Sequence, residues 1–171
     1  MCVSSAFILK KIAVGVVAKK SAGLIGYRVK NLKLQVFLVH PGGPFWRNKD
    51  EGAWSIPKGE YSDNEDPLEA AKREFKEETG YEVTGNLVAL SPVKQAGGKK
   101  VHAWAVEGDY DADKIVSSVF VMEWPPRSGK LEKFPEVDRA QWFFLEEAKK
   151  KILKSQTPLL EDLCKKIGIS E

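Results

Sequence analysis

The pattern of apolar and polar residues along the chain predicts a mixed α/β domain. Stretches of alternating or continuous apolar residues, bounded by turn residues, are typical of strands. They predict strands at 22–30, 33–40, 100–107, 116–124 and 141–144, an extended segment at 81–94 and a loop at 125–135. Apolar residues at helical spacing predict helices at 67–79, 145–154 and 158–167. We therefore expect one mixed sheet with helices on its faces.

The helix predicted at 67–79 has clear end signals. Asp66 is a good N-cap, Pro67 suits the first helical position, and Glu69 completes a capping box. Gly80 suits the position after the helix, where a left-handed backbone conformation is common. The apolar residues between these ends lie on one face and are expected to pack in the core: Leu68, Ala71 and Phe75.

A different face of this helix carries Glu74, Glu77 and Glu78, which the helical spacing makes neighbours. Crowded carboxylates repel each other, so a solvated helix would be more stable with alternating charges. A divalent cation among them would explain the crowding, because Mg²⁺ prefers oxygen ligands and often binds substrate phosphates as well. The alternative is an acidic solvated face, partly neutralised by Arg73 and Lys76.

The surrounding residues favour the metal interpretation, because residues 59–81 resemble the Nudix box. Every fixed residue of that box is present at the required spacing: Gly59, Glu65, Arg73, Glu74, Glu77, Glu78 and Gly80. Two apolar positions hold Phe75 and Tyr81, where the family more often has aliphatic residues. The strand pattern extends the resemblance to about residues 20–165.

The resemblance implies an α/β/α sandwich with a mixed sheet. It also implies hydrolysis of a diphosphate linkage in a nucleoside diphosphate linked to another group. Mg²⁺ or Mn²⁺ would be the cofactor, held by the Gly59 carbonyl and the three helix glutamates: Glu74, Glu77 and Glu78. Arg73 would orient these glutamates through a salt bridge, and Glu65 would support them. The metal would neutralise charge on the phosphoryl oxygens and activate the attacking water.

Residues outside the helix are further candidates. Lys58, directly before the box glycine, is a candidate to contact a substrate phosphate, or else it is a solvated lysine. Many Nudix enzymes take an extra catalytic or metal-binding carboxylate from a loop before the last strand, where this chain has Glu136. Glu123, at the end of the preceding strand, is the competing candidate. We expect Glu136 to be the base that accepts a proton from water.

The substrate class is less sharply indicated. The Trp-x-x-Pro-Lys-Gly sequence at 54–59 resembles Nudix members that act on dinucleoside polyphosphates and on diphosphoinositol polyphosphates. A dinucleoside polyphosphate is the best single prediction, with nucleoside triphosphates, RNA 5′ ends and diphosphoinositol polyphosphates as alternatives. At residues 96–99 the chain lacks the proline or tyrosine that subgroups acting on ADP-ribose or diadenosine polyphosphates often have. A non-catalytic nucleotide sensor on the same fold is the alternative from another class.

Composition narrows the remaining possibilities. The apolar content of 43% and charged content of 30% in 171 residues are typical of a soluble globular domain. A net charge of +3 argues against a dedicated nucleic-acid surface but does not oppose a phosphorylated small molecule. Two cysteines at opposite ends indicate a reducing compartment, so we expect a cytoplasmic protein.

Residues 1–20 precede the first strand that the sequence pattern predicts. Residues 1–20 are predicted to be an N-terminal extension or an edge strand, and residues 21–171 the Nudix domain. The longest apolar run, at 12–18, is too short to span a membrane. We expect residues 1–18 to be dispensable, so that a chain beginning at Ala18 remains soluble and active. Insolubility or a much lower melting temperature of that chain would contradict this boundary.

Overall fold

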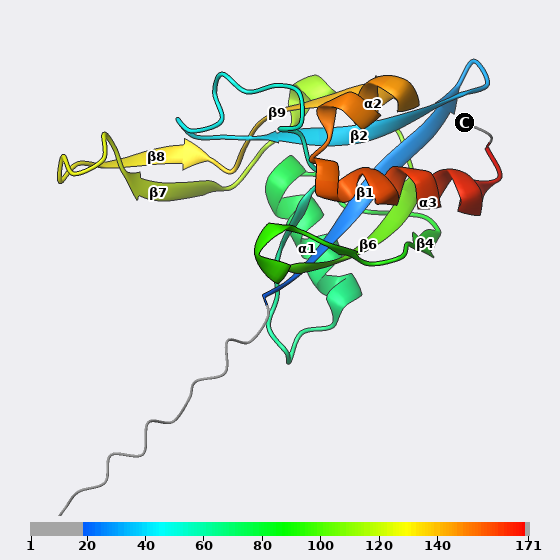
Figure 1. Cartoon of the computed structure of the whole chain (residues 1–171), viewed down its shortest axis with the longest axis horizontal. Helices are drawn as coiled ribbons and strands as arrows, with labels where there is room; N and C mark the ends of the chain where they lie inside the picture. The colour runs from blue at the N-terminus through cyan, green and yellow to red at the C-terminus, as the bar shows by residue number, and fades with distance from the viewer. Residues whose placement is uncertain (1–18, 170–171) are drawn as a thin grey trace, which may run out of the picture.

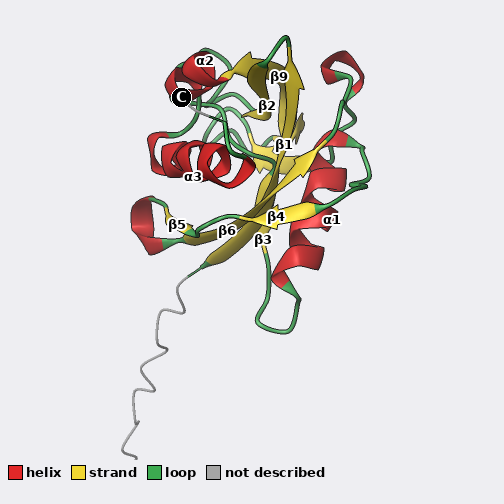
Figure 2. Cartoon of the chain, turned by 90° about the vertical axis from the view of Figure 1, so that its right-hand side faces the viewer, coloured by secondary structure: helices red, strands yellow, loops and turns green. Residues whose placement is uncertain are grey.

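The computed structural model describes residues 19–169 as two helical layers around a mixed sheet (Figures 1 and 2). The strands are β1 (Lys20–Lys30), β2 (Lys33–Pro41), β3 (Lys58–Glu60), β4 (Leu87–Ala89), β5 (Val93–Lys94), β6 (Lys100–Glu107), β7 (Val119–Glu123), β8 (Leu131–Pro135) and β9 (Val137–Phe144). The α-helices are α1 (Pro67–Thr79), α2 (Leu145–Lys151) and α3 (Thr157–Ile167). Short 3₁₀ turns lie at Ala96–Gly98, Ala112–Lys114 and Lys154–Gln156.

The central sheet has the strand order β4-β6-β1-β2-β9, and it mixes parallel with antiparallel pairs. Neighbouring β1 and β6 run parallel, whereas β1 with β2, β2 with β9 and β4 with β6 run antiparallel. The short β3 pairs with the start of β1, and β5 pairs with the start of β6. Pairing with β1 fixes β3, and therefore the first residues of the Nudix box, to the centre of the sheet.

Each face of the sheet has its own apolar core. Successive side chains of a strand point to opposite faces, so Leu24 packs on one side and Ile25 on the other. On the first side β1 and β2 pack against α1, whose Ala71 and Phe75 are fully buried. On the second side the sheet packs against α2 and α3 through their buried residues: Leu145, Ala148, Leu159, Leu160, Leu163 and Cys164. The predicted α/β/α sandwich is confirmed.

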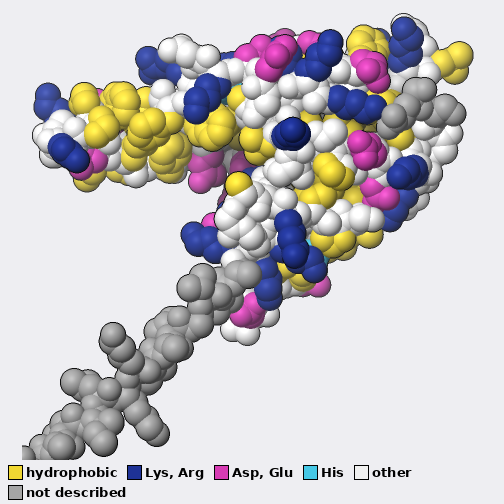
Figure 3. All heavy atoms as spheres, in the orientation of Figure 1, with side chains coloured by type: hydrophobic (Ala, Val, Ile, Leu, Met, Phe, Trp, Pro, Cys, Tyr) yellow, Lys and Arg dark blue, Asp and Glu magenta, His cyan; other side chains and the backbone are white. Residues whose placement is uncertain are grey.

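A separate two-stranded sheet of β7 and β8 extends from the main body, and we call it the arm (Figure 1). It exposes the apolar side chains of Val119, Val121 and Leu131, and hydrophobic side chains dominate the visible face of the arm in Figure 3. The same figure shows acidic side chains in the angle between the arm and the body. An isolated hairpin is at best marginally stable in water, so the contacts at its root matter.

The expected elements agree with the structure in the long strands and in α1. The segments predicted at 22–30, 33–40 and 100–107 form β1, β2 and β6 within two residues of their ends. Several expectations were wrong in detail. The loop expected at 125–135 contains β8, the extended segment at 81–94 holds only the short β4 and β5, and the last strand begins at Val137 instead of Gln141.

The predicted extension at 1–20 falls almost entirely outside the described residues, which begin at Lys19; β1 itself starts at Lys20. The domain boundary and the dispensability of residues 1–18 stay predictions. Among residues 19–169 no helix has the length and apolar character needed to cross a membrane.

Candidate active site

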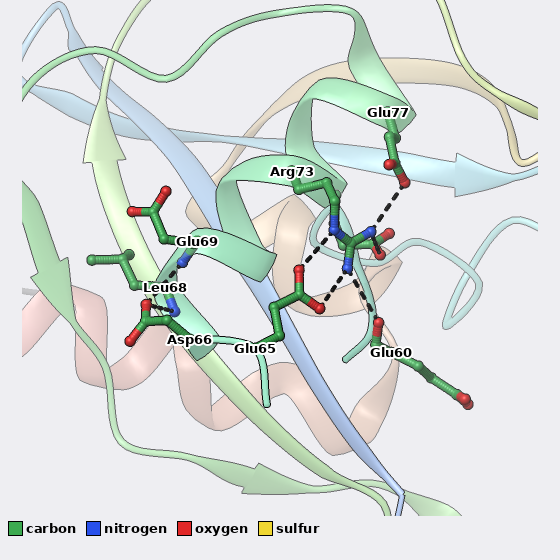
Figure 4. A network of polar contacts seen from close by, with 8 residues as sticks. Glu60, Glu65, Asp66, Leu68, Glu69, Arg73 and Glu77 are labelled. Atoms are coloured by element: carbon green, nitrogen blue, oxygen red, sulfur yellow. Dashed lines mark hydrogen bonds and ion pairs between the residues drawn. The ribbon is translucent and has the colours of Figure 1, made fainter. Parts of the chain in front are cut away.

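The ends of α1 are set by the residues that the sequence indicated. The carboxylate of Asp66 accepts hydrogen bonds from the N–H groups of Leu68 and Glu69, both at 3.0 Å (Figure 4). At the other end Gly80 has a left-handed conformation (φ 82°), and its N–H donates to the Lys76 carbonyl at 2.8 Å. The Glu69 side chain accepts from Lys72 (2.8 Å) instead of returning to the N-cap. With both ends fixed and one face buried, the opposite face of α1 has a defined direction.

Arg73 connects the carboxylates on that face (Figure 4). Its Nε and Nη2 donate to the two carboxylate oxygens of Glu65 at 2.9 and 3.2 Å, which is a bidentate pair. Its Nη1 donates to Glu74 at 2.6 Å and to Glu77 at 3.3 Å. The bonds with Glu65 raise the pKa of Arg73 above its already high range, and those with Arg73 lower the pKa of Glu65. Arg73 therefore lies where the family resemblance requires an orienting cation.

Gly59 and Glu74 meet where β3 passes α1. A Cβ atom on Gly59 would overlap the carboxyl group of Glu74, so only glycine allows this approach of strand and helix. Glu74 is buried, with a side chain only 9% exposed. Burial raises the pKa of the Glu74 carboxyl, although Arg73 opposes this effect. The box glycine and the first box glutamate are thus in direct contact.

Glu78 and Lys58 form a second pair next to this contact. The backbone N–H of Lys58 donates to Oε2 of Glu78 at 3.1 Å. Burial raises the pKa of Glu78 to about 8 and lowers that of Lys58, and the attraction between the two charges opposes both shifts. A small cavity of about 80 Å³ opens here, and Lys58, Glu78, Glu136 and Ser55 line it together with apolar residues of β2 and β9 and Ile56.

The two candidate bases lie in different places. Glu136 joins β8 to β9 at the root of the arm, and its charge contributes to raising the pKa of both Glu74 and Glu78. Glu123 lies at the far end of β7, where its carboxylate accepts the Gly129 N–H at 2.7 Å. The geometry thus brings Glu136, and not Glu123, to the box glutamates, while its role as a base stays a prediction.

A divalent cation such as Mg²⁺ requires several oxygen donors around one point. Within residues 19–169 no three His, Cys, Asp or Glu side chains are gathered closely enough to hold a metal ion. Oxygens of Glu74 and Glu77 are instead bonded by Arg73, and one of Glu78 is bonded by Lys58. The chemistry nevertheless fits: the donors are hard oxygens, and a cation can replace the proton that burial favours on Glu74 and Glu78.

The sequence analysis missed Ser118, whose Oγ donates to Oε2 of Glu136 at 2.6 Å. It lies eighteen residues before Glu136 in the chain. No local pattern marks it, because the contact exists only once β7 pairs with β8. Lys58 and Glu136 both lie close to the box glutamates in the second half of α1.

Comparison with known proteins places the chain in a family. The family model described as the NUDIX domain matches residues 20–163. A comparison with curated proteins gives no match.

Several solved structures share the fold. A C. elegans Ap4A hydrolase binary complex is 24% identical, with a TM-score of 0.62, and the match covers 88% of this chain and 98% of that chain. The NUDIX domain of Shewanella oneidensis NrtR, complexed with ADP ribose, is 15% identical, with a TM-score of 0.62 and coverage of 88% of this chain and 89% of that chain. The E. coli ORF135 protein is 24% identical, with a TM-score of 0.54 and coverage of 86% of this chain and 89% of that chain. These identities show the fold, and the family model shows the membership. The chain therefore belongs to the Nudix family and is a hydrolase acting on phosphoric anhydrides.

Proposed function

We propose that this protein is a Mg²⁺- or Mn²⁺-dependent pyrophosphohydrolase whose substrate is a dinucleoside polyphosphate or a nucleoside triphosphate. One observation carries the proposal: Glu78 of α1, the lysine before the box glycine and Glu136 line one small cavity, and Glu78 accepts the N–H of that lysine. The dinucleoside polyphosphate is favoured by the Pro-Lys-Gly sequence and by the structural likeness to a protein described as an Ap4A hydrolase.

The residues divide the work between holding a metal and positioning the reactants. The Gly59 carbonyl and the glutamates of α1 would hold the ion: Glu74, Glu77 and Glu78. When bound, the ion supplies charge neutralisation at the phosphoryl oxygens and a more acidic water. Arg73 keeps two of the carboxylates oriented through the bonds described above. Lys58 lies on the cavity wall, where an ammonium group can contact a phosphate.

Glu136 completes the reaction as the proton acceptor. The water oxygen forms a bond to phosphorus while the bridging P–O bond on the other side breaks. The water proton moves to the Glu136 carboxylate, and the electron pair of the broken bond leaves with the departing phosphate oxygen. The box glutamates are less available as bases, because a bound cation would occupy their oxygens.

A substrate panel tests this proposal. The purified chain is incubated with Mg²⁺ and each of several compounds: diadenosine polyphosphates, nucleoside triphosphates, ADP-ribose, triphosphorylated RNA and a diphosphoinositol polyphosphate. Products are separated by chromatography, with a parallel series in excess chelator. We expect metal-dependent cleavage of a dinucleoside polyphosphate or a triphosphate to give nucleotides. Cleavage confined to RNA ends or to the inositol compound would overturn the substrate class. Binding of nucleotides without any turnover would instead indicate a sensor.

A further inference from the structure

The root of the arm is fastened to the last turn of α1. Residues 116–118 run from the body into β7, and two of their N–H groups bond to carbonyls of the helix. Val116 donates to Thr79 at 3.0 Å, and Ser118 donates to Glu77 at 2.7 Å. Both acceptors belong to the turn that carries the last two box glutamates. The start of β7 therefore keeps a fixed place relative to those glutamates.

Ser118 also holds the candidate base. Its Oγ donates to Oε2 of Glu136 at 2.6 Å, and its carbonyl accepts the Glu136 N–H at 2.9 Å. The Glu136 carbonyl in turn accepts the Gly42 N–H at 2.9 Å. Over residues 19–169, the other carboxylate oxygen, Oε1, has no hydrogen-bond partner. One oxygen is thus fixed by a serine, while the other is available to a water molecule.

We propose that Ser118 is a positioning residue that holds the Glu136 carboxylate at a constant spacing from the glutamates of α1. The proposal rests on the proposed role of Glu136 as the base. Ser118 bonds to the backbone of Glu77 and not to its side chain, and its hydroxyl bonds to the Glu136 carboxylate, through which it would act. Ser118 bonds both to α1 and to Glu136, so it links the helix that carries the box glutamates with the segment that carries Glu136.

The shape of the molecule explains why such a link is needed. The arm extends away from the body, and its strands pair only with each other (Figure 1). A base at the root of such an arm would follow the motions of the arm and would rotate about its own side-chain bonds. A hydrogen bond from a residue tied to α1 restricts both motions. Proton transfer depends steeply on geometry, so a small loss of order should lower the rate of the chemical step.

The neighbouring Ser117 provides a matched control. It is also half-buried, and its Oγ accepts the Val137 N–H at 2.9 Å and donates to the Ser118 carbonyl at 3.0 Å. It therefore stabilises the same root but touches only backbone groups. Removing its hydroxyl should cost stability without changing the orientation of the Glu136 carboxylate.

The experiment compares Ser118→Ala, Ser118→Thr and Ser117→Ala in the full chain, with thermal melting to confirm folding. We expect Ser118→Ala to lower kcat roughly ten- to a hundred-fold, with KM changed less than about twofold. Ser118→Thr keeps the hydroxyl and should restore most of the rate. Ser117→Ala should stay within about threefold of the wild-type kcat. Adding Ser118→Ala to Glu136→Gln should lower kcat no further, because the serine acts through that carboxylate.

Two results would overturn the inference: an equal loss of kcat in Ser117→Ala and Ser118→Ala, or an additional loss from Ser118→Ala in the Glu136→Gln background. Failure of the proposed function has a different signature, because the wild-type chain itself would then show no metal-dependent hydrolysis. Crystal structures of both alanine variants give a readout without activity. The Glu136 carboxylate should lose its single orientation in Ser118→Ala and keep it in Ser117→Ala; one unchanged orientation in both would contradict the proposal.

Discussion

The helix α1 and the root of the arm both supply carboxylates to the candidate site, but they do so in different ways. In α1 the glutamates are brought together by helical spacing alone, and Arg73 beside them completes the network. At the root of the arm, Glu136 reaches the same place through contacts with Ser118 and Gly42, which are distant in sequence. The first arrangement is local, whereas the second depends on the folded chain. We infer that the positions of the α1 glutamates are set by the helix itself, whereas the position of Glu136 depends on tertiary contacts such as the one with Ser118.

We expect the largest loss of activity from changes to the glutamates of α1. Replacing Glu77 or Glu78 by Gln keeps the shape but removes a carboxylate that we propose as a metal ligand. We expect kcat/KM to fall by about two to four decades, or roughly 3 to 5 kcal/mol in transition-state stabilisation. Glu69→Gln on the exposed side of the same helix is the control and should change the rate little. Full activity in excess chelator would contradict a metal-dependent role for this half.

The second largest effect should distinguish the two candidate bases, Glu136 at the root of the arm and Glu123 at the far end of β7. Glu136→Gln removes the proposed proton acceptor at the root, and we expect kcat to fall about ten- to a thousand-fold with little change in Mg²⁺ dependence. Glu123→Gln changes a carboxylate that bonds only within the turn of the arm, so it should have a smaller effect. Steady-state kinetics at several Mg²⁺ concentrations provide the measurement. If Glu123→Gln is the more damaging change, the base lies on the arm itself and the comparison is wrong.

The same difference explains how much the sequence could predict. The caps and the carboxylate face of α1 follow from the spacing of residues between Asp66 and Gly80, so local rules describe them well. Of the predicted core stripe, Ala71 and Phe75 are buried, whereas Leu68 is only partly buried. The long strands β1, β2 and β6 were also predicted, because continuous apolar runs and alternation are strong signals. Roles of the box residues stay predictions, although their positions agree with the expected arrangement.

The parts that the sequence did not predict lie at the arm. The strand β8, Leu131–Pro135, contains two charged residues and a proline, and only its pairing with β7 makes it a strand. The contact between Ser118 and Glu136 follows from that pairing. The close approach of Gly42 to Pro135 likewise depends on where β2 ends beside the arm. Tertiary contacts of this kind leave no periodic pattern in the sequence.

A smaller effect should follow from a change that moves the root of the arm without touching a carboxylate. A Cβ on Gly42 would overlap the Pro135 carbonyl, so Gly42→Ala must displace the segment before Glu136. We expect a loss of about 1 to 3 kcal/mol in unfolding free energy, as for other overpacked sites, and a lower kcat. Denaturant unfolding measures the loss of unfolding free energy, and steady-state kinetics measure kcat.

Gly129→Ala is the matched control for that change. Gly129 lies in the turn at the tip of the arm with a left-handed backbone (φ 70°), and no atom lies within 4 Å of an added Cβ. Alanine there costs some stability through backbone strain but should leave kcat unchanged. Equal rates for the two glycine variants would show that the position of the root does not matter for the chemical step.

The smallest effect concerns a carboxylate that belongs to neither region. Asp162 lies on α3, across the sheet from α1, and accepts the Ser91 N–H at 2.7 Å. This bond, with help from Lys166, lowers the pKa of Asp162 below its usual range. A carboxyl with a lowered pKa in the folded state contributes stability that is present above its unfolded pKa. That contribution is lost as the pH falls through the folded pKa.

Asp162→Asn should therefore lower the unfolding free energy by about 1 kcal/mol at pH 7. The difference from wild type should shrink only once the pH falls below about 4, the ordinary pKa of an aspartate in an unfolded chain. Urea unfolding between pH 7 and pH 3.5 measures this difference. The hydrolysis rate at pH 7 should not change, because Asp162 stabilises the layer opposite α1 and touches no group of the candidate site. A clear loss of kcat in this variant would mean that the site depends on α3 as well, and that α1 and the root of the arm do not by themselves set its geometry.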